Sequence, residues 1–401
     1  MLPLFSSEFM SLLSQRELSC DLPFYGSVDI RYSGFKMAVV DANLFPAGFN
    51  NLSEEARTKA ALAIQRFFAQ KLPKAHSILL IAEEHTRNTW YLENVRVLKA
   101  LIESAGLSVI CATFLDPKVD NICDHSDFVM LETATGQLLQ MYCFMRLLKG
   151  IQSGERVFDA AILNNDLTSG IAKSLQNLPF PIFPSIAAGW HSRLKSRHFH
   201  HANQIIEEMC QTEGLDPWLW RCDFDMVHSV DINDEASRER LAQSASDLFK
   251  KIDLKYTEYG IREKPLIFLK SDSGTYGMGV ISIEDPSELL TLNRKARNNL
   301  SKGKSGQLME RFILQEGVST LFKSKGYPAE PCLYSVYNQV AGGFFRVNTL
   351  KSERENLNSQ GMLFEPMTEA DAQGHMDTMS ALARISGIAC SHEITELSES
   401  L

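Results

Sequence analysis

The sequence predicts an α/β protein with an N-terminal parallel-sheet region, followed by a C-terminal region with an antiparallel sheet and a glycine-rich flap. Helix and strand patterns alternate between residues 53 and 163, which is typical of a parallel sheet. Further along, two short apolar runs flank a loop that carries Gly274, Gly277 and Gly279. Because 401 residues are long for one core, we expect two or three domains, and three fit the order of the elements. We place them at residues 1–150, 151–250 and 251–401.

The N-terminal elements follow one another in a regular order. Ser53 can cap a helix whose first turn carries Glu54 and Glu55, where acidic groups favour the helix dipole. That helix covers residues 53–72 and a second helix covers 91–105. A buried strand is expected at 77–82 and another strand at 107–114, and the segments 128–131 and 157–163 continue this parallel series.

The middle of the chain looks helical. Residues 180–185 contain two prolines and form a connector, and helices are expected at about 188–209 and 234–256. Residues 301–306 form a turn or loop, and we expect the acidic end at 393–399 to be a frayed turn.

Composition and charge exclude several classes of function. A net charge of −9 argues against a nucleic-acid surface. The eight cysteines are scattered without a Cys-x-x-Cys pair, which favours reduced thiols over a disulfide framework or a zinc site. No apolar run is long enough to span a bilayer and the start lacks a signal-peptide pattern, so we expect a cytoplasmic protein.

The glycine loop joins one strand, at 267–269, to another at 280–283. This order excludes the Walker A loop and the dinucleotide fingerprint, which both lead into a helix. A hairpin flap that folds over an anion remains, and Thr275 and Tyr276 in its tip add hydroxyl donors. Lys270 precedes the loop and could reach a phosphate, a contact worth roughly 4 kcal/mol before desolvation. A mobile hairpin with a solvated lysine is an equal alternative, and no kinase motif follows.

Three downstream segments could serve the same ligand. The strand at 312–314 ends at Gln315, Glu316, Gly317 and Val318, whose backbone could meet a purine edge or simply form a turn. A hairpin with strands at 332–340 and 344–347 and a turn at Gly342-Gly343 would carry Glu330 and Arg346 on one face. These two could hold a metal and a phosphate, or pair with each other. Glu353, Glu355, Asn356 and Asn358 offer hard oxygen ligands for Mg²⁺, or a plain turn.

Polar side chains are dense at two N-terminal places. Arg31, Lys36, Asp41 and Asn43 lie among apolar residues. His85, Arg87 and Asn88 follow a buried strand, where a parallel sheet binds ligands, although Asn88 could equally cap a helix. The histidines at 198, 200 and 201 favour a solvated helix start over a metal site, because no carboxylate or cysteine lies nearby in sequence.

The order of these features resembles the ATP-grasp layout. More closely, the stretches VDIR, GFK, VDANLFPAGFNNL, EEHTRNTWY, KSDSGTYGMGV, GGFFRVN and ENLNSQGM together resemble the proteobacterial glutamate–cysteine ligase family of ATP-grasp type. The likeness runs from about residue 25 to about residue 370.

This resemblance implies a reaction, its cofactors and a set of roles. Magnesium-ATP would phosphorylate the γ-carboxylate of glutamate, and the amine of cysteine would displace the phosphate. Lys270 and the flap from Ser273 to Gly279 would bind ATP phosphates, Lys255 would be a second nucleotide lysine, and residues 315–318 would meet adenine. Arg346 would steady the transferred phosphate, and Glu330, Asn356 and either Glu353 or Glu355 would bind magnesium. The amino-acid substrates would be bound by Arg31, Lys36, Asn43, His85, Arg87 and Asn88.

On this interpretation residues 1–150 form the substrate side, 151–250 a connection, and 251–401 the ATP-grasp nucleotide- and metal-binding domain. A ligase for another acid and amine, and a nucleotide-binding regulator without turnover, remain alternatives. The expected partners are small molecules, and a homo-oligomer is left open.

Overall fold

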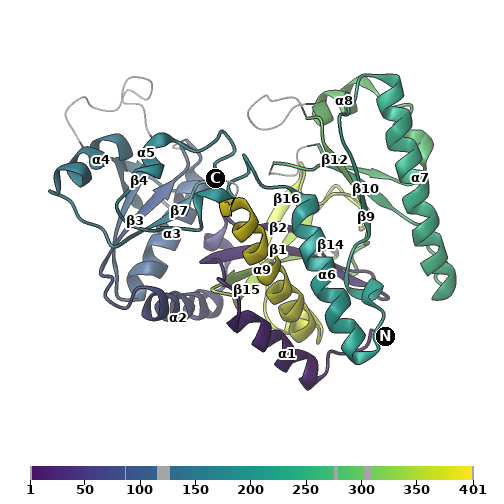
Figure 1. Ribbon diagram of the computed structural model, residues 1–401, viewed down its shortest axis with the longest axis horizontal. Coiled ribbons are helices and arrows are strands. Elements are labelled where there is room, and N and C mark those ends of the chain that lie inside the picture. Colours follow the sequence, from purple (N-terminus) through teal and green to yellow (C-terminus); the bar gives the residue numbers. More distant parts are fainter. Residues whose placement is uncertain (1, 86, 115–126, 275–278, 302–308, 400–401) are drawn as a thin grey trace.

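A computed structural model of the chain describes residues 2–85, 87–114, 127–274, 279–301 and 309–399. In this part of the chain the strands form three sheets, which lie beside one another in Figure 1. The mostly parallel sheet lies at the left of the view, a six-stranded antiparallel sheet lies in the middle, and a four-stranded antiparallel sheet lies at the right.

The first sheet confirms the predicted parallel arrangement, with one exception. Its strands, in spatial order, are β5 (Phe128–Glu132), β6 (Leu138–Cys143), β4 (Ser108–Thr113), β3 (Ser77–Ala82), β7 (Ala160–Asn164) and β8 (Ile182–Phe183). Every pair is parallel except β5 with β6. The expectation that residues 128–131 continue the parallel series was wrong, because the tight turn closed by Thr133 and Gln137 returns the chain antiparallel along β6.

Helices cover both faces of this sheet. Ile78 and Leu80 pack against α2 (Glu54–Lys71) and α3 (Thr89–Ser104). Leu79 and Ile81 face the other way, toward α4 (Phe144–Ser153) and α5 (Lys173–Gln176). Alternate residues of β3 are therefore buried on opposite faces, and this explains its continuous apolar run.

The central sheet joins the two ends of the chain. Its strands, in spatial order, are β16 (Met362–Pro366), β15 (Gln339–Asn348), β14 (Tyr327–Val336), β1 (Tyr25–Tyr32) and β2 (Met37–Asn43), with the short β13 (Lys323–Ser324) beside β14. Because β1 pairs with β14, strand pairing crosses the boundaries expected at residues 150 and 250.

The turn between β14 and β15 lies five residues earlier than the sequence predicted. Tyr337 and Asn338 form it, with φ of +47° and +57°. The side chain of Asn338 donates to the carbonyl of Arg384 at 3.0 Å, which anchors the turn. Gly342 and Gly343 lie inside β15 instead, where a Cβ on Gly342 would come within 2.7 Å of the Cβ of Ala56. Gly342 therefore leaves room for helix α2, Gly343 lies against the backbone of Cys332 in β14, and neither glycine makes the turn.

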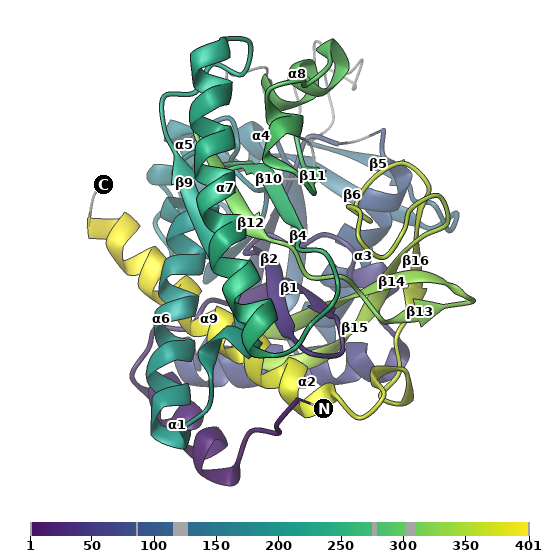
Figure 2. The ribbon, with the colours of Figure 1, turned by 90° about the vertical axis from the view of Figure 1, so that its right-hand side faces the viewer.

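The third sheet carries the glycine loop. Its strands, in spatial order, are β11 (Ile281–Ile283), β10 (Ile267–Ser271), β12 (Phe312–Glu316) and β9 (Phe224–Val227), all antiparallel. The predicted strand–loop–strand hairpin is confirmed by the pairing of β10 with β11. Helix α7 (Glu235–Glu258) packs on this sheet, and α8 (Arg294–Ser301) lies beside it. Figure 2 shows α7 running along the sheet.

Three helices lie together beside the central sheet: α1 (Ser7–Leu18), α6 (Lys195–Glu213) and α9 (Met376–Glu399). The expected helix start at residue 188 was wrong, because a 3-10 turn at Ile186–Ala188 is followed by a bend before α6 begins. The expected frayed end was also wrong: α9 continues to Glu399 and buries Glu393 completely. Shorter 3-10 helices occur at Phe49–Asn51, Pro217–Trp220, Pro286–Leu289 and Ala370–Ala372.

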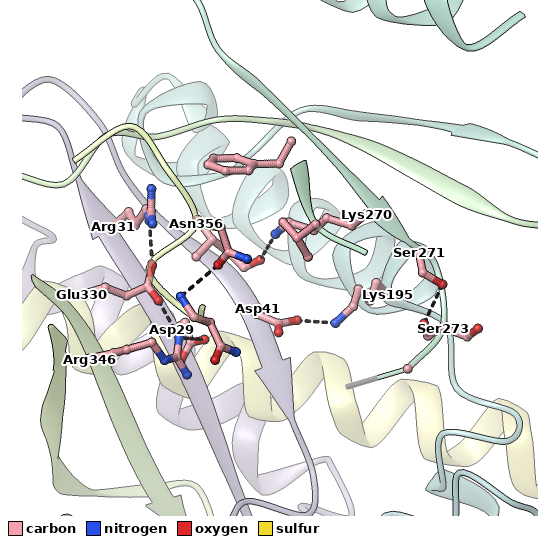
Figure 3. A pocket seen from close by; sticks show the side chains of 15 residues that line it. Asp29, Arg31, Asp41, Lys195, Lys270, Ser271, Ser273, Glu330, Arg346 and Asn356 are labelled. Atoms are coloured by element: carbon pink, nitrogen blue, oxygen red, sulfur yellow. Dashed lines mark hydrogen bonds and ion pairs between the residues drawn. The ribbon is translucent and has the colours of Figure 1, made fainter. Parts of the chain in front are cut away.

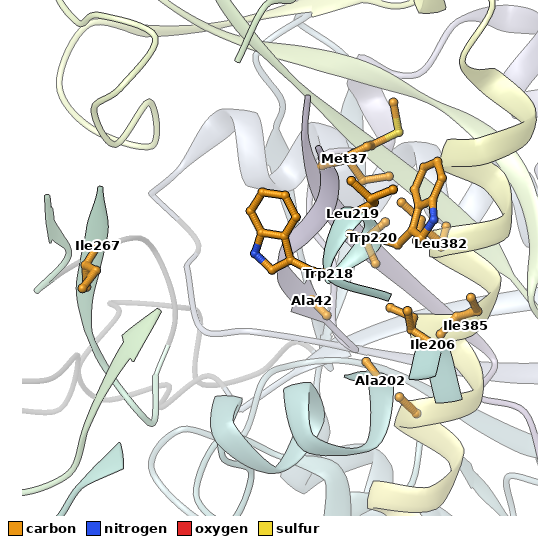
Figure 4. Packing of buried hydrophobic residues seen from close by; sticks show 14 of the residues in the cluster. Met37, Ala42, Ala202, Ile206, Trp218, Leu219, Trp220, Ile267, Leu382 and Ile385 are labelled. Carbon is orange, nitrogen blue, oxygen red and sulfur yellow. The ribbon is translucent and has the colours of Figure 1, made fainter. Parts of the chain in front are cut away.

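The largest core packs the central sheet against α6 and α9. Figure 4 shows Trp220, Leu382 and Ile385 near Ile206 in this cluster. Trp218 and Trp220 are each 1% exposed, and burying such large side chains stabilises the fold by about 3 kcal/mol or more apiece.

The seven described cysteines carry no disulfide. Within the described ranges, no helix is long and apolar enough to cross a bilayer.

Candidate active site

An open pocket lies between the central sheet and the glycine-loop sheet. Most of its lining is polar, and four side chains are cationic while three are carboxylates (Figure 3). The lining residues are Asp29, Arg31, Val40, Asp41, Lys195, Phe268, Lys270, Ser271, Ser273, Gly274, Val280, Glu330, Arg346, Asn356 and Asn358.

Lys270 is a cation of this pocket with no carboxylate partner in the part of the chain that the structure describes. Its Nζ donates to the carbonyl of Val40 at 2.9 Å and to Oε1 of Gln315 at 2.6 Å. Among the described residues no carboxylate lies within ion-pair distance, and the side chain is buried. Burial lowers the pKa of Lys270 to about 8, against the opposing charge of Asp41. A buried cation held by neutral acceptors is suited to an anionic ligand.

A ladder of alternating charges forms one side of the pocket. Arg31 Nε donates to Glu330 at 2.6 Å, and Arg346 Nη1 donates to Glu330 at 2.5 Å and to Asp29 at 2.6 Å. The pairing of Glu330 with Arg346 across β14 and β15 confirms that they share a sheet face. Burial would raise the pKa of Glu330, but the two guanidinium groups outweigh it and hold the pKa below its usual value. For Asp29 burial dominates, and its pKa is raised.

Lys195 and Asp41 form a second charged pair, which lies toward Ser271 and Ser273 in Figure 3. Lys195 is the first residue of α6, and its Nζ donates to Asp41 on β2 at 2.7 Å. Partial desolvation in the pocket opposes ionisation of Asp41, whose side chain is half-buried, yet Lys195 and Lys270 lower its pKa to about 2. Sequence reasoning gave Lys195 no role, because nothing local links it to a strand over 150 residues earlier.

The root of the glycine loop is held firmly. Asp272 accepts from the backbone N–H and the hydroxyl of Ser196, both at 2.8 Å, and Ser271 Oγ donates to the carbonyl of Ser273. Gly274 and Gly279 both have positive φ, and a Cβ on Gly279 would lie 3.2 Å from the carbonyl of Asn299. The predicted flap residues Thr275, Tyr276 and Gly277 lie outside the described residues.

The segment predicted to meet adenine is buried and does not line the pocket. Glu316 pairs with Lys36 at 2.6 Å and accepts from Trp218 Nε1 at 3.0 Å. The backbone N–H groups of Glu316 and Gly317 already donate to the carbonyls of Asp223 and Leu266. Gln315 reaches the pocket only through Lys270, and Val318 lies in a small apolar cluster. Lys36, predicted to bind a substrate, is therefore held in this buried ion pair.

Of the remaining nucleotide and metal candidates, Asn356 lines the pocket, whereas Lys255, Glu353 and Glu355 do not. Lys255 on α7 pairs with Asp216 at 2.8 Å and Glu258 at 2.9 Å, away from the pocket lining. Glu355 pairs with Lys351 at 2.7 Å, and neither it nor Glu353 lines the pocket, whereas Asn356 does.

The pocket contains oxygen ligands that fit magnesium. Glu330 is occupied by two arginines, but 39% of the Asp41 side chain is exposed, against 14% for Asp29 and 5% for Glu330. Magnesium usually takes one or two carboxylates with substrate phosphates, so Asp41 and Asn356 suit it.

The other N-terminal candidates lie apart from the pocket, except Arg31. Asn43 bonds to the backbone of Phe45, and His85 pairs with Glu83 at 2.6 Å. Asn88 caps α3 by accepting from the N–H of Tyr91, and Arg87 is exposed. The structure thus brings together Arg31, Lys270, Ser273, Gly274, Glu330, Arg346 and Asn356.

The histidine cluster also differs from expectation, because His198 is buried. Its ring lies with Cys390 and Glu393 in a group whose ligand atoms fall within 4.8 Å of one another. Arg193 fills this group: Nε donates to Glu393 at 3.0 Å, and Nη2 lies 3.5 Å from both His198 Nδ1 and Cys390 Sγ. A cation is therefore already present, and it is a guanidinium.

Comparison with known families identifies the class of this chain. Residues 8–388 match the model of the GshA family, described as glutamate-cysteine ligase. The match covers most of the chain, and the chain therefore belongs to the glutamate–cysteine ligase family GshA, as its motifs suggested.

A solved structure supports the same membership. A protein of Methylobacillus flagellatus KT, provisionally named a γ-glutamylcysteine synthetase, superposes with a TM-score of 0.84 at 32% identity. The comparison covers 97% of this chain and 93% of that one.

More distant structures give much lower scores. A glutathione synthetase-like effector from Globodera pallida has a TM-score of 0.37 at 9% identity, covering 89% of this chain and 79% of its own. D-alanyl-alanine synthetase A from Vibrio cholerae has a TM-score of 0.34 at 11% identity, and the comparison covers 77% of this chain and 80% of that one. Scores this low support no conclusion. Among curated proteins none matches the sequence.

Proposed function

We propose that this protein is an ATP-dependent ligase that joins the γ-carboxylate of glutamate to the amine of cysteine, giving γ-glutamylcysteine. Membership of the glutamate–cysteine ligase family supports the substrates. One observation supports the use of ATP. Lys270 lies at the root of the glycine loop as a buried cation without a carboxylate partner in the described chain. We further propose an ATP-grasp arrangement, in which the loop closes over the phosphates.

The reaction balances in two steps. The γ-phosphoryl group of ATP passes to a γ-carboxylate oxygen of glutamate, giving ADP and γ-glutamyl phosphate. The amine of cysteine then attacks the carbonyl carbon, the C–O bond to phosphate breaks with its electron pair, and the amine loses a proton. Phosphoryl transfer depends mainly on positioning and charge neutralisation, and the acyl phosphate must be kept from water.

Each charged group of the pocket has a task in this proposal. Lys270, Ser273 and the glycines at 274 and 279 would bind the phosphates of ATP. Arg346 would steady the transferred phosphoryl group, although Asp29 and Glu330 now share its charge. The ladder that contains Arg31 and Asp29 offers both signs of charge, as a zwitterionic amino acid requires.

Magnesium would be held by Asn356 with Asp41 or Glu330 among the pocket residues. When bound, it would neutralise phosphate charge. The roles first predicted for residues 315–318, Lys36, Lys255, Glu355 and the His85–Asn88 segment find no support in their positions, since none of these residues lines the pocket.

The test is ADP release with magnesium-ATP and glutamate, with and without cysteine, followed by mass analysis of the product. Cysteine-dependent ADP release with the mass of γ-glutamylcysteine is expected. ADP release with another amine only would overturn the substrate assignment. Tight ATP binding without turnover on any amino-acid pair would favour a regulatory protein.

Glu330→Gln separates binding from chemistry in the same assay. We expect it to abolish turnover while ATP still binds, because Glu330 orders both Arg31 and Arg346. Unchanged turnover would show that Glu330 has no role in the reaction.

A further inference from the structure

The first turn of α6 connects two walls of the pocket. On one side Lys195 Nζ donates to Asp41 of β2. On the other side the backbone N–H of Lys195 donates to the carbonyl of Asp272 at 2.7 Å, and Ser196 donates twice to the Asp272 carboxylate. Asp272 immediately precedes the glycine loop, so this single turn ties strand β2 to the root of the loop.

Arg193, two residues earlier, fixes the position of this turn. It is 1% exposed, and its Nη1 donates to the carbonyl of Ala42, the residue after Asp41, at 3.1 Å. Its guanidinium lies over the Trp190 ring at 4.9 Å, and Lys195 Nζ lies over the same ring at 4.8 Å. Arg193 therefore contacts the neighbours of both members of the Lys195–Asp41 pair.

Glu393 holds Arg193 from the C-terminal helix. Both carboxylate oxygens accept from Arg193 Nε at 3.0 Å, and Glu393 is fully buried. A buried ion pair adds little net stability compared with an apolar pair of similar volume, but a charge-assisted contact of this kind fixes direction. What the pair supplies here is the position of the α6 turn.

We propose that Glu393 is a positioning residue for the pocket: it holds Arg193, and Arg193 places Lys195 and Asp41 so that Lys195 contacts the phosphates of ATP. This inference rests on the proposed function. Among the described residues Lys195 Nζ has one hydrogen-bond acceptor, Asp41, and an ammonium group has three donors. The pair lies on the same side as Ser271 and Ser273 (Figure 3), near the loop assigned to the phosphates. Glu393 lies beyond the family match, which ends at residue 388.

The experiment measures the Kd of ATP by calorimetry in magnesium buffer, and the KM for each substrate. For Glu393→Gln we expect Kd and KM for ATP to rise about tenfold, while KM for glutamate and cysteine changes less than twofold. Partial unfolding would instead lower the amount of active enzyme without changing Kd. Glu396→Gln is the matched control, because Glu396 also joins α9 to α6, through His201 at 3.2 Å, but at an exposed position. It should leave ATP affinity within twofold.

Two further variants keep the proposal falsifiable if Glu393→Gln does not fold. The double variant Arg193→Met with Glu393→Met replaces the ion pair by apolar side chains, which a buried position tolerates, so the protein should fold. This variant should lose as much ATP affinity as Glu393→Gln. Lys195→Ala should bind ATP about tenfold more weakly, and adding Glu393→Gln to it should cause no further loss. Additive losses, or an unchanged Kd in the double methionine variant, would overturn the proposal.

The wild-type protein separates this inference from the proposed function. If it binds ATP but ligates no amino acids, the function fails, and the Kd comparison still decides the role of Glu393. If it does not bind ATP, both are overturned.

Discussion

The carboxyl edge of the parallel sheet and the pocket beside Lys270 are both rich in polar side chains, but they use them differently. At the sheet edge Asn164 donates to Tyr25 at 3.1 Å and to the carbonyl of Pro46 at 3.0 Å. It also accepts from Asn94 and Tyr91. These residues satisfy one another's hydrogen-bonding groups, and they fill the place where a parallel sheet often binds its ligand.

In the pocket, by contrast, the polar groups are mainly charges, and one cation is left to neutral acceptors. Density of polar residues therefore does not identify a site. A site is identified by charges that the protein itself leaves uncompensated.

The largest effect should come from removing that cation. Lys270→Met keeps the shape of the side chain and should reduce kcat/KM for ATP by about 10³-fold, since one such contact is worth roughly 4 kcal/mol. Lys255→Met is the control, because Lys255 pairs with Asp216 and Glu258 on α7. Equal losses in the two variants would contradict the comparison.

A substitution at the sheet edge should instead affect stability. Asn164→Ala removes the side-chain partner of the Asn94 amide and of the Pro46 carbonyl, both buried, and should lower the free energy of unfolding by about 2–4 kcal/mol. Urea unfolding measures this loss. The kcat of the folded enzyme should not change. A large fall in kcat with normal stability would show that the active site lies at the edge of the parallel sheet.

The pH dependence of ATP binding should report Lys270. Its pKa of about 8 means that the charge is lost as pH rises through 8, so the Kd for ATP should rise about tenfold per unit above that pH. Lys270→Arg, which does not titrate in this range, should flatten the profile.

The same shift has an opposite effect on stability. Because the folded pKa lies below the unfolded value of about 10.4, the unfolded chain binds more protons between these values. The contribution of Lys270 to stability should therefore increase from about pH 8 to about pH 10. Urea unfolding between pH 8 and pH 10 measures this increase. Its absence in Lys270→Met would confirm that Lys270 has the lowered pKa.

The smallest effect should come from Asn88. Asn88→Ala removes the cap of α3 and should cost about 1 kcal/mol of stability, with KM for both amino acids unchanged. A raised KM for glutamate or cysteine would show that this segment binds substrate after all.

Local patterns predicted much of the fold. The strand at Ser77–Ala82 has the expected bounds, α2 and α3 begin within two residues of theirs, and the β10–β11 hairpin is confirmed. The errors involve contacts between distant segments. Gly342 looked like part of a turn because α2, which packs against it, lies far away in sequence. The end at 393–399 looked like a frayed turn because Arg193, the partner of Glu393, lies 200 residues earlier.

The pocket shows the same limit. Lys270, Glu330, Arg346 and Asn356 could be found because each sits beside a local signal, a glycine loop or a hairpin. Lys195 and Asp29 could not, since only tertiary packing brings α6 and β1 to the pocket. Lys36 was predicted for function from the density of polar residues around it, and Glu316 from its place at a strand end, but the two side chains pair with each other inside the core.

Hydrogen exchange with and without magnesium-ATP can decide whether ATP binds in the pocket beside Lys270 or at the edge of the parallel sheet. We predict protection of residues 267–274 and 193–196, which border the pocket, and no change at 83–91 or 164–167 along the parallel-sheet edge. Protection confined to the sheet edge would contradict the account.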